Sequence, residues 1–354
     1  AALERAEDRK ALRLVHSQLR DAVGEAATKL RASFLLPNAA RPPTPARWPR
    51  LEELIVYNVN LEELEALGAA TWGSLRSFCI FDQRNRRTAW DLPCAGALAA
   101  ALRSMPALRA LRLSSVALPN ASAAELFKAK GAAPGLRRLK MFLADVTPVA
   151  ARALATSGWR LEELKLDHCR SLGAAGLELL LAAPTFVLRR LVLSDCSLDA
   201  AALRILANAP WPLEDLDLSR NDFRAAGPEL AALSRHAGLR RLRMDGCFSS
   251  ASFNALVEAA WPALISLQTT GAVDPPRALG AAAFAGFPAL EELVLGGVVL
   301  DEAGVQLLAS RGWPRLRKLG LRDARLGNAK LAALARGEWP ALEVLDLRSN
   351  WIWR

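Results

Sequence analysis

The chain has 354 residues, 52% of them hydrophobic and 23% charged, a composition typical of folded rather than disordered proteins. No run of 18 apolar residues occurs, so the sequence predicts no membrane-spanning helix. The five cysteines show neither a CxxC motif nor the spacing of a zinc site. The formal net charge of +10 is compatible with nucleic acid as a binding partner.

The compartment is indicated by the odd cysteine count and by the first ten residues, which lack the apolar core of a secretory signal. Both features favour a reducing environment, either cytoplasmic or nuclear. An organelle is the alternative if a targeting segment has been removed before Ala1.

The amino-terminal residues EDRKALRLVHSQLRDAV (7–23) predict a short helical segment that differs from the rest of the chain. Asp8 suits a helix start, and apolar residues recur behind it at helical spacing: Leu12, Val15 and Leu19. A proline-rich stretch follows and is typical of a linker. We therefore expect a helical segment over residues 1–35 and a linker over residues 36–47.

Residues 48–354 align in twelve copies on the pattern L-x-x-L-x-L. The first leucine of each copy lies at Leu51, Leu75, Leu108, Leu136, Leu161, Leu188, Leu213, Leu239, Leu264, Leu290, Leu316 and Leu342. The spacing settles at about 26 residues, within the range of leucine-rich repeats. The pattern predicts an α/β solenoid, because no single copy can bury its own apolar face.

Each copy predicts one strand and one helix. The L-x-L step places two side chains on one face of a short strand, and apolar residues at helical spacing follow over 199–209, 301–312 and 327–338. Side chains near these three starts can cap the helices: Asp199, Asp301 and Asn328. We expect a parallel sheet on the concave face and helices on the convex face.

Tryptophan and cysteine recur at fixed positions of the copies. Seven copies carry tryptophan before the strand, which we interpret as core: Trp48, Trp72, Trp159, Trp211, Trp261, Trp313 and Trp339. Residues after the strand predict an inward ladder that satisfies loop backbone groups: Cys169, Cys196, Cys247, Asn221 and Asn350. No catalytic or nucleotide-binding motif is present, so the sequence indicates no enzyme, cofactor or metal site.

The side chains that alternate with the core leucines predict the partner-binding face. They include ten basic and eight acidic residues, a mixture that disfavours a phosphate-binding groove. Exposed aromatic residues among basic ones resemble a protein-binding hot spot. The candidates are Ile55, Tyr57, Phe81, Arg112, Arg138, Lys140, Phe142, Lys165, Arg190, Arg241 and Arg243. The alternative is that the amino-terminal segment covers the first of these strands.

Two further segments are candidate contact sites. An insertion over residues 82–93 predicts a projecting loop with Arg84, Arg86, Arg87 and Trp90. The sequence ends in RSNWIWR, which places Trp351 and Trp353 at the tip of the last copy. Because solenoid ends need a polar cap or a partner, we expect further residues or a contact there.

The segment over residues 7–23 resembles the later part of an F-box. The matching positions are Asp8, Leu12, Leu14, Val15, Leu19 and Arg20, whereas His16 replaces a cysteine and the first F-box helix has no counterpart. The repeats resemble the F-box/leucine-rich-repeat class and the ribonuclease-inhibitor-like repeats of algal, plant and some bacterial proteins.

This resemblance implies a substrate receptor of a cullin ubiquitin ligase, in which a Skp-family adaptor binds the F-box and the repeats hold a protein. The sequence thus predicts a non-enzymatic protein-recognition scaffold. A structural subunit of a large assembly is the alternative, and RNA or DNA binding is a third possibility.

Overall fold

The computed structural model describes residues 28–33, 45–46, 48–82, 90–116, 118–128, 131–144, 146–271 and 282–351. They belong to two compact units, which we treat separately. Unit 1 comprises Ala1–Ala144 with Thr156–Leu161, and unit 2 comprises Asp145–Ala155 with Glu162–Arg354. Among the described residues, no helix has the length and apolar character needed to cross a bilayer.

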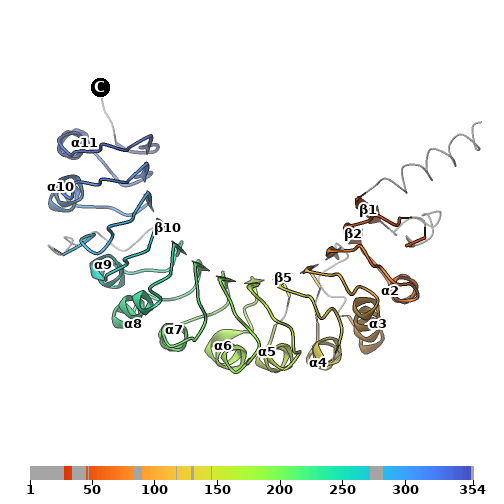
Figure 1. Cartoon of the computed structure of the whole chain (residues 1–354). Coiled ribbons are helices and arrows are strands. Elements are labelled where there is room, and N and C mark those ends of the chain that lie inside the picture. The colour runs from red at the N-terminus through yellow and green to blue at the C-terminus, as the bar shows by residue number, and fades with distance from the viewer. Residues whose placement is uncertain are drawn as a thin grey trace, which may run out of the picture. The chain divides into compact units, whose positions relative to one another are not determined.

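Unit 1 is a parallel sheet with helices on one side (Figure 1). Neighbours in the chain are neighbours in the sheet, as expected when each strand is followed by a crossover helix. Its described elements are β1 (Lys29–Ser33), β2 (Glu53–Tyr57), α2 (Leu61–Gly68), β3 (Ser77–Phe81), α3 (Leu92–Arg103), β4 (Ala110–Ser114), α4 (Asn120–Lys128) and β5 (Arg138–Phe142).

Strand β1 lies within the range for which the sequence predicted a helical segment, so that prediction is wrong for Lys29–Ser33. The strand pairs in parallel with β2, and Leu30 is in register with the core residue Leu54. The sequence pattern does not indicate β1, because KLRAS contains one leucine and no L-x-x-L-x-L pattern. The predicted helix over residues 7–23 lies outside the described residues.

Unit 2 repeats the same plan, with helices along one side of its strands (Figure 1). Its described elements are α5 (Pro148–Ala155), β6 (Glu163–Asp167), α6 (Gly173–Leu181), β7 (Arg190–Val192), α7 (Ala200–Ala207), β8 (Asp215–Asp217), α8 (Gly227–Ala232), the 3-10 helix η1 (Leu233–Arg235), β9 (Arg241–Arg243), α9 (Ser250–Glu258), β10 (Ser266–Thr270), β11 (Glu292–Gly296), α10 (Glu302–Ser310), β12 (Lys318–Gly320), α11 (Asn328–Ala335) and β13 (Val344–Asp346).

The core of each unit lies between its sheet and its helices. The repeated leucines fill it; Leu111 and Leu267, for example, are 1% and 0% exposed. The residues that alternate with them along a strand point away from the helices, and we call this side the open face. The parallel α/β solenoid predicted from the sequence is confirmed.

Five of the seven pre-strand tryptophans are core residues, as predicted: Trp72, Trp159, Trp211, Trp261 and Trp313; Trp48 and Trp339 are half-buried. Some of the indoles also satisfy the ends of helices. Trp261 is 1% exposed, and its indole Nε1–H donates to the carbonyl of Leu256 in the last turn of α9 at 2.9 Å. Trp313 makes the same bond to Leu308 at 2.8 Å. The last carbonyls of a helix have no hydrogen-bond donor within the helix. Each of these two indoles supplies the donor for one such carbonyl.

Two series of hydrogen bonds stabilise the turns that follow the strands. Each series repeats from one copy to the next, and we call each of them a ladder. In the first, a residue with positive φ donates its backbone N–H to a carbonyl of the next copy, as from His168 to Ser194 at 2.8 Å. In the second, the buried side chain of Asn221 accepts two backbone N–H bonds and donates to backbone carbonyls. The Sγ of Cys247 donates to the carbonyl of Leu218. The predicted asparagine and cysteine ladder is confirmed.

Two of the three predicted helix caps are present. Asp199 and Asp301 accept the backbone N–H of the third helical residue of α7 and α10. The third prediction is wrong, because α11 begins at Asn328 itself and Gly327 occupies the capping position. The one-residue difference arises because glycine also tolerates the extended backbone needed there.

Candidate protein-binding surface

The open face of unit 1 is built from rows of residues that lie side by side across β2–β5. One row contains Tyr57, Phe81, Ser114 and Phe142 in direct register, which places two aromatic rings on neighbouring strands. The next row contains Ile55, Cys79, Arg112 and Lys140. The sequence predicted these residues to share a face, and the register brings them together.

The aromatic rings and one arginine form a contiguous cluster. The rings of Tyr57 and Phe81 are stacked, with centroids 5.4 Å apart and planes inclined by 20°. The Cζ atom of Arg112 lies 4.8 Å from the centroid of Phe81, and its Nε–H donates to Ser114 Oγ at 3.1 Å. The guanidinium is thereby fixed in position over an aromatic face.

We call the group Tyr57, Phe81, Arg112, Arg138 and Phe142 the aromatic–arginine surface. Phe142 is 37% exposed at the end of β5, and the two arginines are exposed. Ile55, which the sequence included among the contact residues, is instead core and 6% exposed. The alternation along β2 does not distinguish Ile55 from Tyr57, which has the same two flanking strands and is half-buried.

The basic residues predicted on the open face of unit 2 have acidic partners within the unit. Asp215 accepts from Arg190 Nε at 2.7 Å and from Arg241 Nε at 3.1 Å. Arg243 Nε donates to Asp245 at 2.6 Å. Lys165 Nζ lies 3.5 Å from Glu163. These four basic residues are therefore poor candidates for binding an anionic partner.

The sequence contains a signal for this pairing, which is visible only when equal positions of successive copies are compared. Arg190, Asp215 and Arg241 occupy the same position in three successive copies, so a parallel register places them side by side. In unit 1, by contrast, neither Arg112 nor Arg138 has a carboxylate partner among the described residues.

The remaining predicted contact residues lie elsewhere. Trp90 is 4% exposed and donates to Asp82 at 3.3 Å, so it is a core residue and not part of an exposed loop. Trp351 is 55% exposed, and Arg325 lies over its ring. The other predicted contact residues lie outside the described part of the chain: Leu12, Val15, Leu19, Arg84, Arg86, Arg87 and Trp353.

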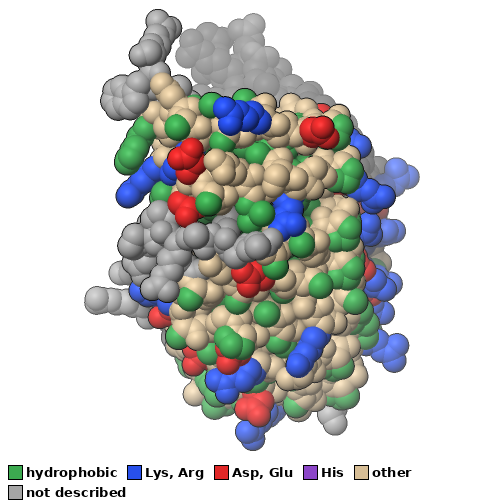
Figure 2. All heavy atoms as spheres, turned by 90° about the vertical axis from the view of Figure 1, so that its left-hand side faces the viewer, with side chains coloured by type: hydrophobic (Ala, Val, Ile, Leu, Met, Phe, Trp, Pro, Cys, Tyr) green, Lys and Arg blue, Asp and Glu red, His purple; other side chains and the backbone are tan. Residues whose placement is uncertain are grey.

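The last described copy of unit 2 also exposes apolar side chains. Val344 and Leu345 of β13 are 49% and 47% exposed. Figure 2 shows basic side chains along one edge at this end of the chain and apolar side chains scattered among polar ones over the rest of that view. In this copy Arg325 lies over the ring of Trp351, but no ring stacks on Trp351 among the described residues, in contrast to the Tyr57–Phe81 pair of unit 1.

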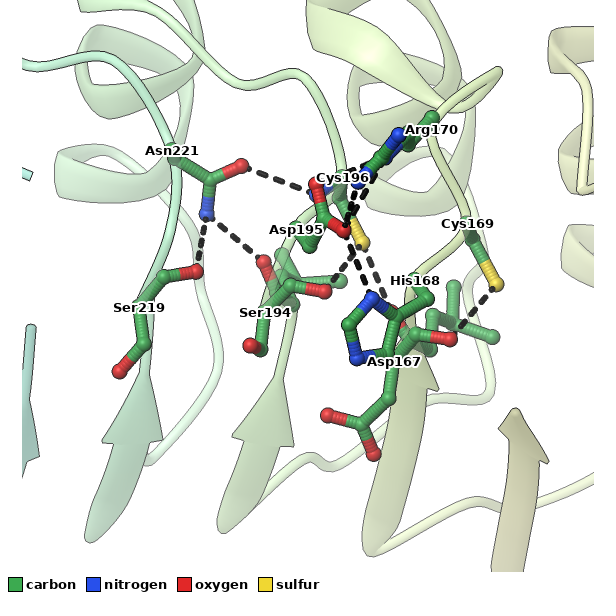
Figure 3. A network of polar contacts seen from close by, with 11 residues as sticks. Asp167, His168, Cys169, Arg170, Ser194, Asp195, Cys196, Ser219 and Asn221 are labelled. Carbon is green, nitrogen blue, oxygen red and sulfur yellow. Dashed lines mark hydrogen bonds and ion pairs between the residues drawn. The ribbon is translucent and has the colours of Figure 1, made fainter. Parts of the chain in front are cut away.

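A second polar group in unit 2 joins three successive turns (Figure 3). His168 Nδ1 lies 2.7 Å from Asp195 Oδ2, and Arg170 binds both carboxylate oxygens of Asp195 at 2.8–3.0 Å.

A neighbouring hollow of about 470 Å³ is lined by His168, Ser194, Ser219 and Arg243 among others. The buried Cys196 thiol donates to Leu166, and burial raises its pKa far above the usual value, which disfavours a nucleophilic thiolate.

Asp195 provides a pH-dependent contribution to stability. The hydrogen bond from Arg170 is the main cause that lowers the pKa of this carboxyl, and His168 adds to the effect. A carboxyl with a lowered pKa in the folded state stabilises the fold above its unfolded-state pKa of about 3.9, and this stabilisation is lost as the pH falls through the folded-state pKa.

We therefore expect Asp195→Asn to lower the urea midpoint at pH 7, with a difference from the wild type that narrows below about pH 4. Urea denaturation between pH 3 and pH 8 measures this difference. Glu178→Gln, which removes an exposed carboxyl from α6, is the control. A difference that stays constant over the whole pH range would show that the carboxylate of Asp195 is not the stabilising species.

No grouping of three or more His, Cys, Asp or Glu suited to a metal ion occurs in the described part of the chain. The observed ladders and parallel strands define the chain as an α/β leucine-rich-repeat solenoid. No family model matches the sequence, and no curated protein does.

Solved structures support the fold. The chain is similar to TLR13 in the crystal structure of a TLR13–ssRNA13 complex, with a TM-score of 0.54 and 21% identity. That match covers 89% of this chain and 42% of the TLR13 chain, so the chain spans less than half the length of this neighbour.

Two further matches have TM-scores below 0.5. One is in a structure of the Rad7 and Elc1 complex of yeast (TM-score 0.47, 16% identity, 100% of this chain and 91% of that chain). The other is an internalin of Listeria monocytogenes (TM-score 0.42, 14% identity, 88% of this chain and 71% of that chain).

Proposed function

We propose that this chain is a non-enzymatic scaffold that recognises a partner protein through the aromatic–arginine surface of unit 1. The observation that supports the proposal is the Tyr57–Phe81 stack with Arg112 fixed above it, on a sheet face that carries no helix among the described residues. Aromatic residues and arginine dominate the binding energy of protein interfaces because they bury large areas at low entropic cost.

Affinity capture from cells of the source organism tests the proposal. We expect the double variant Tyr57→Ala/Phe81→Ala to recover the main partner protein at least tenfold less efficiently than the wild type, as measured by quantitative mass spectrometry. Gln268→Ala, on the open face of unit 2, is the matched control and should recover the partner normally. Equal recovery by the double variant and the wild type, with circular dichroism unchanged, would contradict the proposal.

The same capture decides between two finer roles. The F-box resemblance of residues 7–23 supports a substrate receptor of a cullin ubiquitin ligase, and this role requires a Skp-family adaptor among the captured proteins. The alternative is a permanent subunit of a large assembly, which requires the chain to migrate in a large particle without an adaptor. We favour the receptor, on the resemblance alone.

A further inference from the structure

The charges on the two open faces differ. In unit 2, the positions that alternate with the core residues along β6–β13 hold seven basic and seven acidic residues, a net charge of zero. The basic ones are Lys165, Arg190, Arg241, Arg243, Lys318, Arg322 and Arg348, and the acidic ones are Glu163, Asp167, Asp215, Asp217, Asp245, Glu292 and Asp346. In unit 1, the corresponding positions of β3–β5 hold three basic residues and no acidic one.

The acidic residue of β2 does not neutralise this charge. Glu53 Oε2 lies 2.7 Å from Lys29 Nζ on β1, so its carboxylate is already paired. The positive charge of Arg112 and Arg138 on β4 and β5 therefore remains available to a ligand. Because both side chains are exposed, an anionic group can reach them directly from solvent.

The guanidinium group of Arg112 is positioned so that it can bind a carboxylate. Its Nε–H donates to Ser114 Oγ and its guanidinium lies over Phe81, whereas neither of its Nη groups has a bonded partner among the described residues. A guanidinium positioned in this way loses less conformational entropy on binding, and two adjacent N–H groups match the two oxygens of a carboxylate.

We infer that the aromatic–arginine surface binds an extended acidic segment of the partner that carries a planar aromatic side chain. The inference rests on the proposed function and adds the chemistry of the partner. Arg138 is two residues from Lys140, the neighbour of Arg112 in register, so Arg112 and Arg138 lie about 8 Å apart along the sheet. Acidic residues at alternate positions of an extended chain are separated by about 7 Å, and the aromatic side chain can pack on Tyr57 or Phe142.

A nucleic acid is the other ligand that stacks on aromatic rings and binds arginine. It is disfavoured because a phosphate backbone requires a continuous basic track, whereas the open-face positions of β3–β5 hold three basic residues, none of them on β3. An oligonucleotide therefore serves as a competing probe in the test.

The test measures fluorescence anisotropy of the full chain with three labelled probes: a 12-residue peptide of repeated Glu-Trp-Glu, the same peptide with lysine in place of glutamate, and a 12-nucleotide oligouridine. We expect the glutamate peptide to bind most tightly, and its Kd to rise about tenfold with Arg112→Gln or Arg138→Gln. Arg243→Gln is the matched control, because this exposed arginine is already paired with Asp245. Equal affinity for the two peptides, or tighter binding of oligouridine, would overturn the inference.

Alkylation of Cys79 gives a second readout that needs no variant. This half-buried thiol lies in register beside Arg112 on the open face, so bound glutamate peptide should slow its reaction with iodoacetamide severalfold. Cys94 at the start of α3 should react at an unchanged rate.

The results separate the inference from the proposed function. If the glutamate peptide neither binds nor protects Cys79, while Tyr57→Ala/Phe81→Ala still reduces recovery of the native partner, the surface is confirmed and its acidic ligand is rejected. If the double variant also recovers the native partner normally, the proposed function is rejected together with the inference.

Discussion

Replacement of Asn221 by alanine is expected to lower the free energy of unfolding by at least about 3 kcal/mol. The side chain is 7% exposed and satisfies four backbone groups in the turn after β8. Oδ1 accepts the N–H groups of Cys196 and Leu198 at 3.0 Å, and Nδ2 donates to the carbonyls of Leu193 and Leu218 at 2.8 Å. Alanine leaves both N–H groups and the carbonyl of Leu193 buried without a partner, at about 1–3 kcal/mol for each one that water cannot reach, whereas the carbonyl of Leu218 keeps the Cys247 thiol. Urea denaturation followed by circular dichroism measures the loss.

The neighbouring copies supply a graded control. Cysteine occupies the same position at Cys247, where its Sγ donates to the carbonyl of Leu218. Asn221→Cys should therefore restore one donor and lose less stability than Asn221→Ala. Asn208→Ala removes an exposed asparagine whose amide binds the carbonyl of Arg204, and it should change stability by less than about 1 kcal/mol. If alanine at position 221 cost no more than alanine at position 208, the ladder would not be a source of stability.

The fold could be predicted from the sequence because the repeated leucines carry both its period and its register. The tryptophan and asparagine positions were predictable for the same reason, since a residue type that recurs at one position of a solenoid has one structural role. β1 could not be found in this way. β1 pairs with β2 through backbone hydrogen bonds, with Leu30 in register with Leu54. Backbone pairing of this kind produces no repeated residue pattern in the sequence.

The candidate site was only partly predictable, because burial and pairing depend on the neighbouring copies. Ile55 alternates with core residues as Tyr57 does and has the same flanking strands, yet it is 6% exposed whereas Tyr57 is half-buried. Trp90 lies in an insertion that looked like an exposed loop, but its ring reaches the core. The pairing of Arg241 with Asp215 follows from comparing equal positions of adjacent copies. Pairing between equal positions of adjacent copies therefore removes the basic residues of unit 2 from the candidate surface.

Replacement of Trp261 by alanine is expected to lower the free energy of unfolding by about 3–5 kcal/mol. The ring is 1% exposed between α9 and β10, so alanine creates a cavity that the packed neighbours only partly fill. The variant also leaves the carbonyl of Leu256 without the indole donor that it has at 2.9 Å. Because each copy of a solenoid contacts only its neighbours, hydrogen exchange should rise most in α9, β9 and β10.

Trp261→Phe separates the two contributions to this loss. Phenylalanine keeps most of the apolar volume but cannot donate to Leu256, so the remaining loss of about 1–3 kcal/mol measures the unsatisfied carbonyl. Trp339→Phe is the matched comparison, because the same bond to Leu334 is made by a half-buried ring near the end of unit 2, where water can replace the indole. Its cost should be smaller than that of Trp261→Phe. Equal costs at the two sites would mean that the loss comes from ring volume and not from the capping bond at the helix end.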